Sequence, residues 1–120
     1  HPAGPDDVML AHAEALVKEC AKYEHVITMG DHNARPGSPA YEIVAEALTN
    51  TWIAKYPDGS GPPHPSWPES TPENRDYDVS TRRIDHIFVS PGFEVLESYY
   101  VLSPESETDH PAHWSVLRRK

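Results

Sequence analysis

The stretch EHVITMGDHNARPGSPAYEIV, residues 24–44, combines a strand signal and a helix signal with a polar segment between them. An apolar run from Val26 to Met29 stops at Gly30, and Asp31 and Asn33 follow on alternate positions. On an extended chain these two side chains leave on the same face, about 7 Å apart. Asp and Asn at a strand end often form a turn, because both side chains hydrogen-bond their own backbone. The stretch by itself therefore leaves a turn and a functional site open.

The sequence around this segment predicts helices on either side of a strand. Residues 5–23 predict a helix, since a proline and two aspartates suit its first turn and apolar residues recur at helical spacing. Residues 25–29 predict a short buried strand. Residues 38–49 predict a second helix, with Ser38 as its N-cap.

The C-terminal part predicts mainly strands. Residues 50–56, NTWIAKY, are compatible with a strand, and residues 57–75, which hold six prolines and two glycines, predict a long loop. Strands are predicted at residues 83–90, 94–103 and 112–120, with a Pro-Gly turn after the first of them. The order of elements predicts one α+β domain over residues 1–120, with helices layered on a sheet.

Composition narrows the class of protein. A chain of 120 residues is the size of one domain, and its single cysteine, Cys20, excludes an internal disulfide. No apolar run approaches the length of a membrane span. The net charge of −9 disfavours a protein that grips long nucleic acid through a basic surface, unless bound divalent cations offset the charge locally. Solubility, or a salty habitat, is the simpler explanation of the acidic balance.

Further polar residues stand where the predicted strands begin or end. Asp85 lies in the otherwise apolar segment IDHIFV, and a buried carboxylate is costly unless it is paired. A salt bridge with Arg82 or Arg83 would satisfy it, and so would a catalytic role. Asp109 and His110 precede the last strand, where they could form a plain turn. Strand ends are also where a rigid scaffold presents catalytic groups.

Taken in order, the segments GDHN (30–33), RIDHIFVS (83–90) and TDHPAHW (108–114) resemble the C-terminal half of the endonuclease/exonuclease/phosphatase superfamily. This is the fold of DNase I, the abasic-site endonucleases, neutral sphingomyelinases and inositol-polyphosphate phosphatases. The resemblance implies half of a DNase I-like four-layered α/β sandwich, a mostly antiparallel sheet with two helices. It extends to His1, because a strand that ends in His, a helix and then the GDxN strand follow one another in such members.

The resemblance also implies roles for the motif residues in a metal-dependent phosphoesterase, in which water attacks the phosphoester in line. Asp31 would position the water or bind the metal, and Asn33 would donate to a phosphate oxygen. Asp109 would be a metal ligand, and hard oxygen ligands favour Mg²⁺ or Mn²⁺ over zinc. His110 would activate the water, with Asp85 fixing its tautomer and raising its basicity.

Other candidates are weaker. His1 would be the second histidine of the site, donating to a phosphate oxygen or assisting the leaving group. His32 is either structural or a substrate contact, and Trp67, in the proline-rich loop, is either an anchor or a surface on which substrate stacks. Surface or packing roles are expected for the remaining histidines: His12, His25, His64, His86 and His113.

A complete member of this superfamily is about twice as long, and its first half brings an Asn and a metal-binding Glu. Glu14 and Glu19 follow His1 on a helix, which is the wrong place for that ligand. The chain is then a fragment, a subunit completed by a second copy or a complementary N-terminal half, or a stand-alone module. Its sheet should expose one apolar face.

The substrate and the compartment stay open at this stage. Nucleic acid, either DNA or RNA, is the first expectation, which makes the chain a nuclease. The acidic balance keeps lipid and small phosphoesters open, as for a phosphatase or a phospholipase-type member. The alternative from another class is a non-catalytic half-domain that binds metal or a partner chain.

Overall fold

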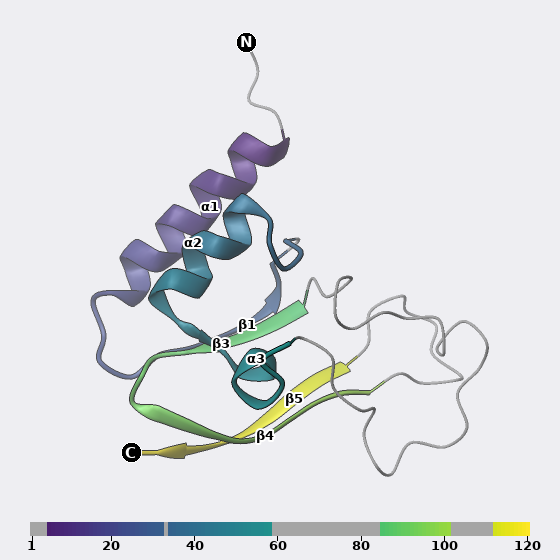
Figure 1. Ribbon diagram of the computed structural model, residues 1–120. Coiled ribbons are helices and arrows are strands. Elements are labelled where there is room, and N and C mark those ends of the chain that lie inside the picture. The colour runs from purple at the N-terminus through teal and green to yellow at the C-terminus, as the bar shows by residue number, and fades with distance from the viewer. Residues whose placement is uncertain (1–4, 33, 59–84, 102–111) are drawn as a thin grey trace, which may run out of the picture.

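The computed structural model describes residues 5–32, 34–58, 85–101 and 112–120. In Figure 1, helices α1 and α2 lie together on one side of strands β1 and β3, and the short helix α3 lies between β3 and the β4–β5 pair. This arrangement confirms the α+β class. The bounds of the elements are α1 Pro5–Cys20, β1 Ile27–Asp31, α2 Pro39–Ala47, β2 Thr49–Asn50, α3 Thr51–Lys55, β3 Asp85–Val89, β4 Phe93–Val101 and β5 Ala112–Arg119.

Both long helices form where the sequence predicts them. Helix α1 ends at Cys20 rather than at residue 23, because the chain tightens into turns that include a bond from the Tyr23 amide to the Cys20 carbonyl (3.1 Å). Helix α2 begins at Pro39, and the Ser38 hydroxyl accepts a hydrogen bond from the Tyr41 amide (3.4 Å), which confirms the predicted N-cap. The two helices pack on each other and, through Tyr41, on the sheet.

Strands β1, β3 and β2 form an antiparallel sheet in the order β1-β3-β2. Strand β1 lies two residues further along the chain than the predicted strand, so that Asp31 belongs to it. The strand continues through Gly30, whose φ of 135° is a conformation that side chains other than glycine rarely adopt. Asp31 is therefore held by strand pairing with β3 rather than placed in a free turn.

The prediction of a strand at residues 50–56 is wrong. Only Thr49–Asn50 pair as a strand, and Thr51–Lys55 form helix α3, a third helix where two were expected. The reason is a cap: the Asn50 side-chain oxygen accepts hydrogen bonds from the amides of Trp52 (3.0 Å) and Ile53 (3.2 Å). The cap satisfies the first amides of the helix while Trp52 is fully buried.

Strands β4 and β5 form a second antiparallel sheet with one irregularity. The register shifts between Val95 and Glu97, so Leu96 is an extra residue, a β-bulge. Because β5 runs without a matching shift, Val95 before the bulge and Ser98 and Tyr100 after it face the same side of the sheet. Odd-numbered residues before the bulge and even-numbered residues after it therefore face the same side of the sheet.

Helix α3 joins the two sheets. Trp52 and Tyr100 are buried, with ring centroids 5.0 Å apart in an edge-to-face contact. Beside them the Ser115 hydroxyl lies 2.8 Å from that of Thr51 and 3.0 Å from that of Ser98. An apolar contact and a polar network thus hold α3 against β4 and β5.

One face of β1 is open. Met29 is 67% exposed and Ile27 is 45% exposed, whereas Ile87 and Val89, opposite them on β3, are buried, so the expected bare apolar face is limited to β1. Within the described ranges no helix is both long and apolar enough to cross a bilayer.

The lone cysteine has the character of a structural thiol. Cys20 is partly buried, and burial, together with the charge of Glu19, raises the pKa of its thiol. A raised pKa lowers the thiolate fraction and with it the reactivity.

Candidate active site

Two acidic side chains meet at one end of the β1–β3 pair. Asp31, the last residue of β1, is directly opposite Asp85, the first residue of β3. Residues directly opposite in an antiparallel pair project to the same face, with Cβ atoms about 5 Å apart. The register thus brings two carboxylate-bearing residues together on one face at this end of the sheet.

The backbone at this end of the sheet is fixed from the second sheet. The Tyr100 hydroxyl donates a hydrogen bond to the Asp85 carbonyl at 2.6 Å, and Tyr100 is only 2% exposed. This bond connects β4 to the first residue of β3. Asp85 is therefore anchored both through pairing with β1 and through a buried phenol.

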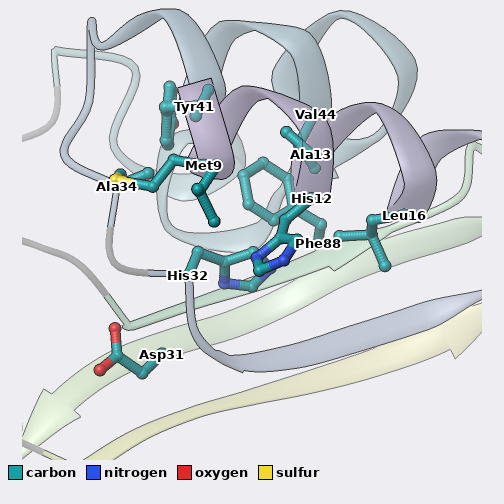
Figure 2. Close-up of a pocket in the computed structure, with 12 residues that line it drawn as sticks. Met9, His12, Ala13, Leu16, Asp31, His32, Ala34, Tyr41, Val44 and Phe88 are labelled. Atoms are coloured by element: carbon teal, nitrogen blue, oxygen red, sulfur yellow. The ribbon is translucent and has the colours of Figure 1, made fainter. Parts of the chain in front are cut away.

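His32 lies on the other side of the strand end. Its Nδ1 donates a hydrogen bond to the Gly30 carbonyl (3.0 Å). Its ring packs on the rings of Phe88 and His86, with centroids 5.3 Å and 5.5 Å apart. Figure 2 shows the Asp31 carboxylate apart from this ring and directed away from it. The last residue of β1 and the residue directly after it thus point in different directions.

A cavity of about 640 Å³ opens between α1, α2 and the sheet, with His32 in its wall. Its lining is mainly apolar and includes Met9 and Leu16 from α1, Tyr41 from α2 and Phe88 from β3 (Figure 2). Burial in this setting lowers the pKa of His32. The bond to Gly30 and the charges of Asp31 and Asp85 act in the opposite direction but do not outweigh it, so the ring is neutral at pH 7.

The described residues include Asp31, His32 and Asp85 from the predicted site. The other predicted site residues lie outside the described ranges: His1, Asn33, Trp67, Asp109 and His110. Substrate contact by His32 stays a prediction; both His32 and Asp31 line the cavity, and Figure 2 shows the Asp31 carboxylate directed away from the His32 ring.

The two carboxylates have the ligand chemistry that a hard divalent cation requires. Asp31 and Asp85 offer oxygen donors, which Mg²⁺ and Mn²⁺ prefer. Among the residues that the structure describes, no group of three or more His, Cys, Asp or Glu side chains is placed to hold a metal ion. The described part thus offers carboxylates of the right chemistry, and the predicted ligand Asp109 lies outside it.

Sequence reasoning assigned His86 to packing and overlooked its polar contacts. The side chain is 1% exposed, and its Nε2 lies 2.7 Å from the carbonyl oxygen of Ala34 in the segment after β1. A signal for this was present: the alternation in RIDHIFVS puts His86 on the same face as Phe88. A ring with two polar atoms on a core face requires hydrogen-bond partners.

Comparison with known proteins agrees with the α+β fold. A model of the endonuclease/exonuclease/phosphatase family matches residues 4–110. The chain therefore belongs to the endonuclease/exonuclease/phosphatase family, whose members are generally metal-dependent phosphoesterases and nucleases.

A solved relative has the same fold. The chain is similar to the crystal structure of the endonuclease/exonuclease/phosphatase from Bacteroides vulgatus, with a TM-score of 0.68 and 18% sequence identity. The match covers 96% of this chain and 45% of that chain, which confirms the expected half of a domain. A search of curated proteins found no match.

Proposed function

We propose that the chain carries the phosphate-facing half of the active site of a metal-dependent phosphoesterase, and that its reaction is hydrolysis of phosphodiesters in nucleic acid. The observation that carries the proposal is the register that puts Asp31 opposite Asp85 at the end of the β1–β3 pair. Among the described residues of this family member, the Asp31–Asp85 pair is the feature best suited to orient a water molecule for attack on a phosphoester.

Each site residue has a role in this proposal. Asp31 orients the attacking water, and Asn33 donates to a phosphate oxygen as negative charge grows on it. His110 takes the proton of the water, while Asp85 holds the imidazole in the required tautomer. A divalent cation such as Mg²⁺ or Mn²⁺, held by Asp31 and Asp109, would supply charge neutralisation at the phosphate when bound.

The remaining predicted residues would act at the edge of this site. His1 would be a second donor to phosphate, and Trp67 would offer a ring on which a base stacks. The predicted partner is a complementary N-terminal half, which would bring the metal-binding glutamate of the family, or a second copy, which would cover the bare face of the sheet.

The test is hydrolysis of bis-p-nitrophenyl phosphate and of plasmid DNA with Mg²⁺ or Mn²⁺. We expect His110→Ala and Asp85→Asn to lower the rate about 100-fold or more, since general acid–base catalysis typically contributes that much. EDTA should abolish the rate, and Mn²⁺ should restore it. Equal rates for wild type and His110→Ala would contradict the catalytic assignment.

Glu94→Gln is the matched control, because it also converts a carboxylate to an amide. Glu94 lies near the start of β4, away from Asp85, and its ion pair with Arg118 (2.7 Å) is largely exposed. Exposed ion pairs contribute little to stability. The control should therefore keep the wild-type rate.

The acidic net charge favours a second candidate, a phosphoesterase for lipid or small phosphoesters. Turnover of bis-p-nitrophenyl phosphate without cleavage of plasmid DNA would support it. Binding of Mn²⁺ without turnover of any phosphoester would instead support the non-catalytic half-domain.

A further inference from the structure

A hydrogen-bonded chain crosses the sheet on the side opposite Asp31 and Asp85. It runs from Asn50, at the start of α3, through the His86 ring on β3, to the Ala34 carbonyl after β1. The Asn50 Nδ2 lies 3.4 Å from His86 Nδ1, and His86 Nε2 lies 2.7 Å from the Ala34 oxygen. Asn50, His86 and Ala34 are all at most 4% exposed, so water does not compete for these bonds.

The partners fix which ring nitrogen of His86 carries the proton. The Ala34 carbonyl can only accept, so Nε2 must donate to it. The Asn50 oxygen already accepts from the amides of Trp52 and Ile53, so its NH₂ group is directed toward Nδ1. Nδ1 must then accept, and His86 is the neutral Nε2–H tautomer.

The ring itself is held in place by other rings. Measured between ring centroids, Tyr41 from α2 lies 5.1 Å from it, His32, directly after β1, 5.5 Å, and Phe88 from β3 5.6 Å. These contacts prevent the ring from turning without displacing its neighbours. The donor at Nε2 therefore has a fixed position relative to β3.

We propose that His86 is a positioning residue that clamps the segment after β1, at Ala34, beside the end of the sheet where Asp31 and Asp85 stand. Ala34 lies three residues after Asp31, the last residue of β1, so a fixed Ala34 carbonyl restrains the chain close to the strand end. Asp85 and His86 are neighbours on β3 and point to opposite faces. Strand β3 thus presents the Asp85 carboxylate on one face, and His86 on its other face holds the segment after β1.

The first test needs no variant and no activity. In two-dimensional ¹H–¹⁵N spectra that correlate ring nitrogens with ring protons, His86 should show the pattern of a neutral Nε2–H tautomer at pH 7. Its Nε2 proton should also exchange slowly with water, because the group is buried. An Nδ1–H pattern would overturn the clamp.

The second test separates the hydrogen bond from the ring. His86→Phe keeps an aromatic ring among Tyr41 and Phe88 but removes the donor, while His86→Gln can restore a donor near the Nε2 position. The reporter is exchange of the Ser38 amide, which closes the next turn by bonding to the Arg35 carbonyl (3.0 Å). We expect faster exchange in His86→Phe and a return toward wild type in His86→Gln; identical exchange in all three proteins would overturn the proposal.

Leu48→Ala is the control for general loss of stability. Leu48 is buried in the same core but caps the far end of α2 from Ser38. It should lower the melting temperature without selectively accelerating exchange at Ser38. The two variants are compared at similar melting temperatures. If the Ser38 amide exchanges equally fast in Leu48→Ala and in His86→Phe, the clamp is overturned.

The third test rests on the proposed phosphoesterase function. With bis-p-nitrophenyl phosphate, His86→Phe should lower kcat about tenfold or more while KM changes less, since a misplaced catalytic group affects the chemical step. His86→Gln should recover part of kcat, and equal kcat in all three proteins would overturn the link between clamp and site. A wild type without turnover would instead overturn the proposed function, and the clamp would be judged by the two spectroscopic tests.

Discussion

At the scale of single residues, burial of His32 links the stability of the chain to pH. Its pKa in the folded chain lies below the usual value of about 6.5, so the unfolded chain binds the proton more readily. Stability should therefore fall as the pH drops through about 6.5 toward the folded pKa.

His32→Phe tests this dependence because it fills the space beside Phe88 with a ring that cannot be protonated. The difference in unfolding free energy between the variant and wild type should move in favour of the variant as the pH falls from about 7.5 to about 5. Urea denaturation at the two pH values measures it. A difference that stays constant would show that His32 does not titrate with folding.

At the scale of elements, Asn50 determines how α3 begins and what it touches. Its oxygen caps the helix, and its amide donates to His86 on β3. Asn50→Ala should cost about 1–2 kcal/mol for the cap alone, and more because a buried bond to His86 is also lost. Urea unfolding gives the value.

Asn50→Ser separates the two contributions. A serine at this position can still cap the helix but is too short to reach the His86 ring. Asn50→Ser should lower the free energy of unfolding less than Asn50→Ala does. The loss that remains in Asn50→Ser measures the missing contact with His86. An equal loss for both variants would contradict the capping role.

Also at this scale, local sequence signals predicted most helices and strands, whereas the register in which the strands pair did not follow from the sequence. Spacing and a serine cap were enough for α2, and alternation was enough for β3. The extension of β1 to Asp31 depends on pairing with β3, which is a long-range property. Helix α3 was missed because its apolar residues resemble a strand, although Asn50 was a readable capping signal.

The same reasoning explains what was predictable of the site. Asp31 and Asp85 could each be singled out, one at a strand end and the other within an apolar strand. That they stand opposite each other depends on how β1 and β3 align, which neither segment reveals separately. The contacts of His86 and Tyr100 likewise join segments that are distant in the sequence.

At the scale of the whole molecule, the open face of β1 favours association. Met29 and Ile27 are exposed on a strand whose last residue is Asp31. Apolar side chains exposed side by side gain free energy when another polypeptide covers them. In the absence of a complementary half, we expect a second copy to do so.

Light scattering after size exclusion, over a range of protein concentrations, measures this association. The apparent mass of wild type should rise with concentration, and Met29→Lys should return it to that of the monomer. Glu24→Gln, on the exposed segment before β1, changes the net charge by the same amount and is the control for a simple change of charge. A wild type that stays monomeric throughout would contradict the expectation.

The bulge in β4 has a consequence for how the length of this chain can vary. Because Leu96 has no place in the register, removing it leaves every pair of β4 and β5 intact and keeps Ser98 and Tyr100 on their face. Removing Tyr99 instead would turn Tyr100 outward and break its bond to Asp85. Deletion of Leu96 should therefore preserve a cooperative thermal transition that deletion of Tyr99 abolishes. Homologous chains should accordingly differ in length by one residue at position 96 more readily than anywhere else in this strand.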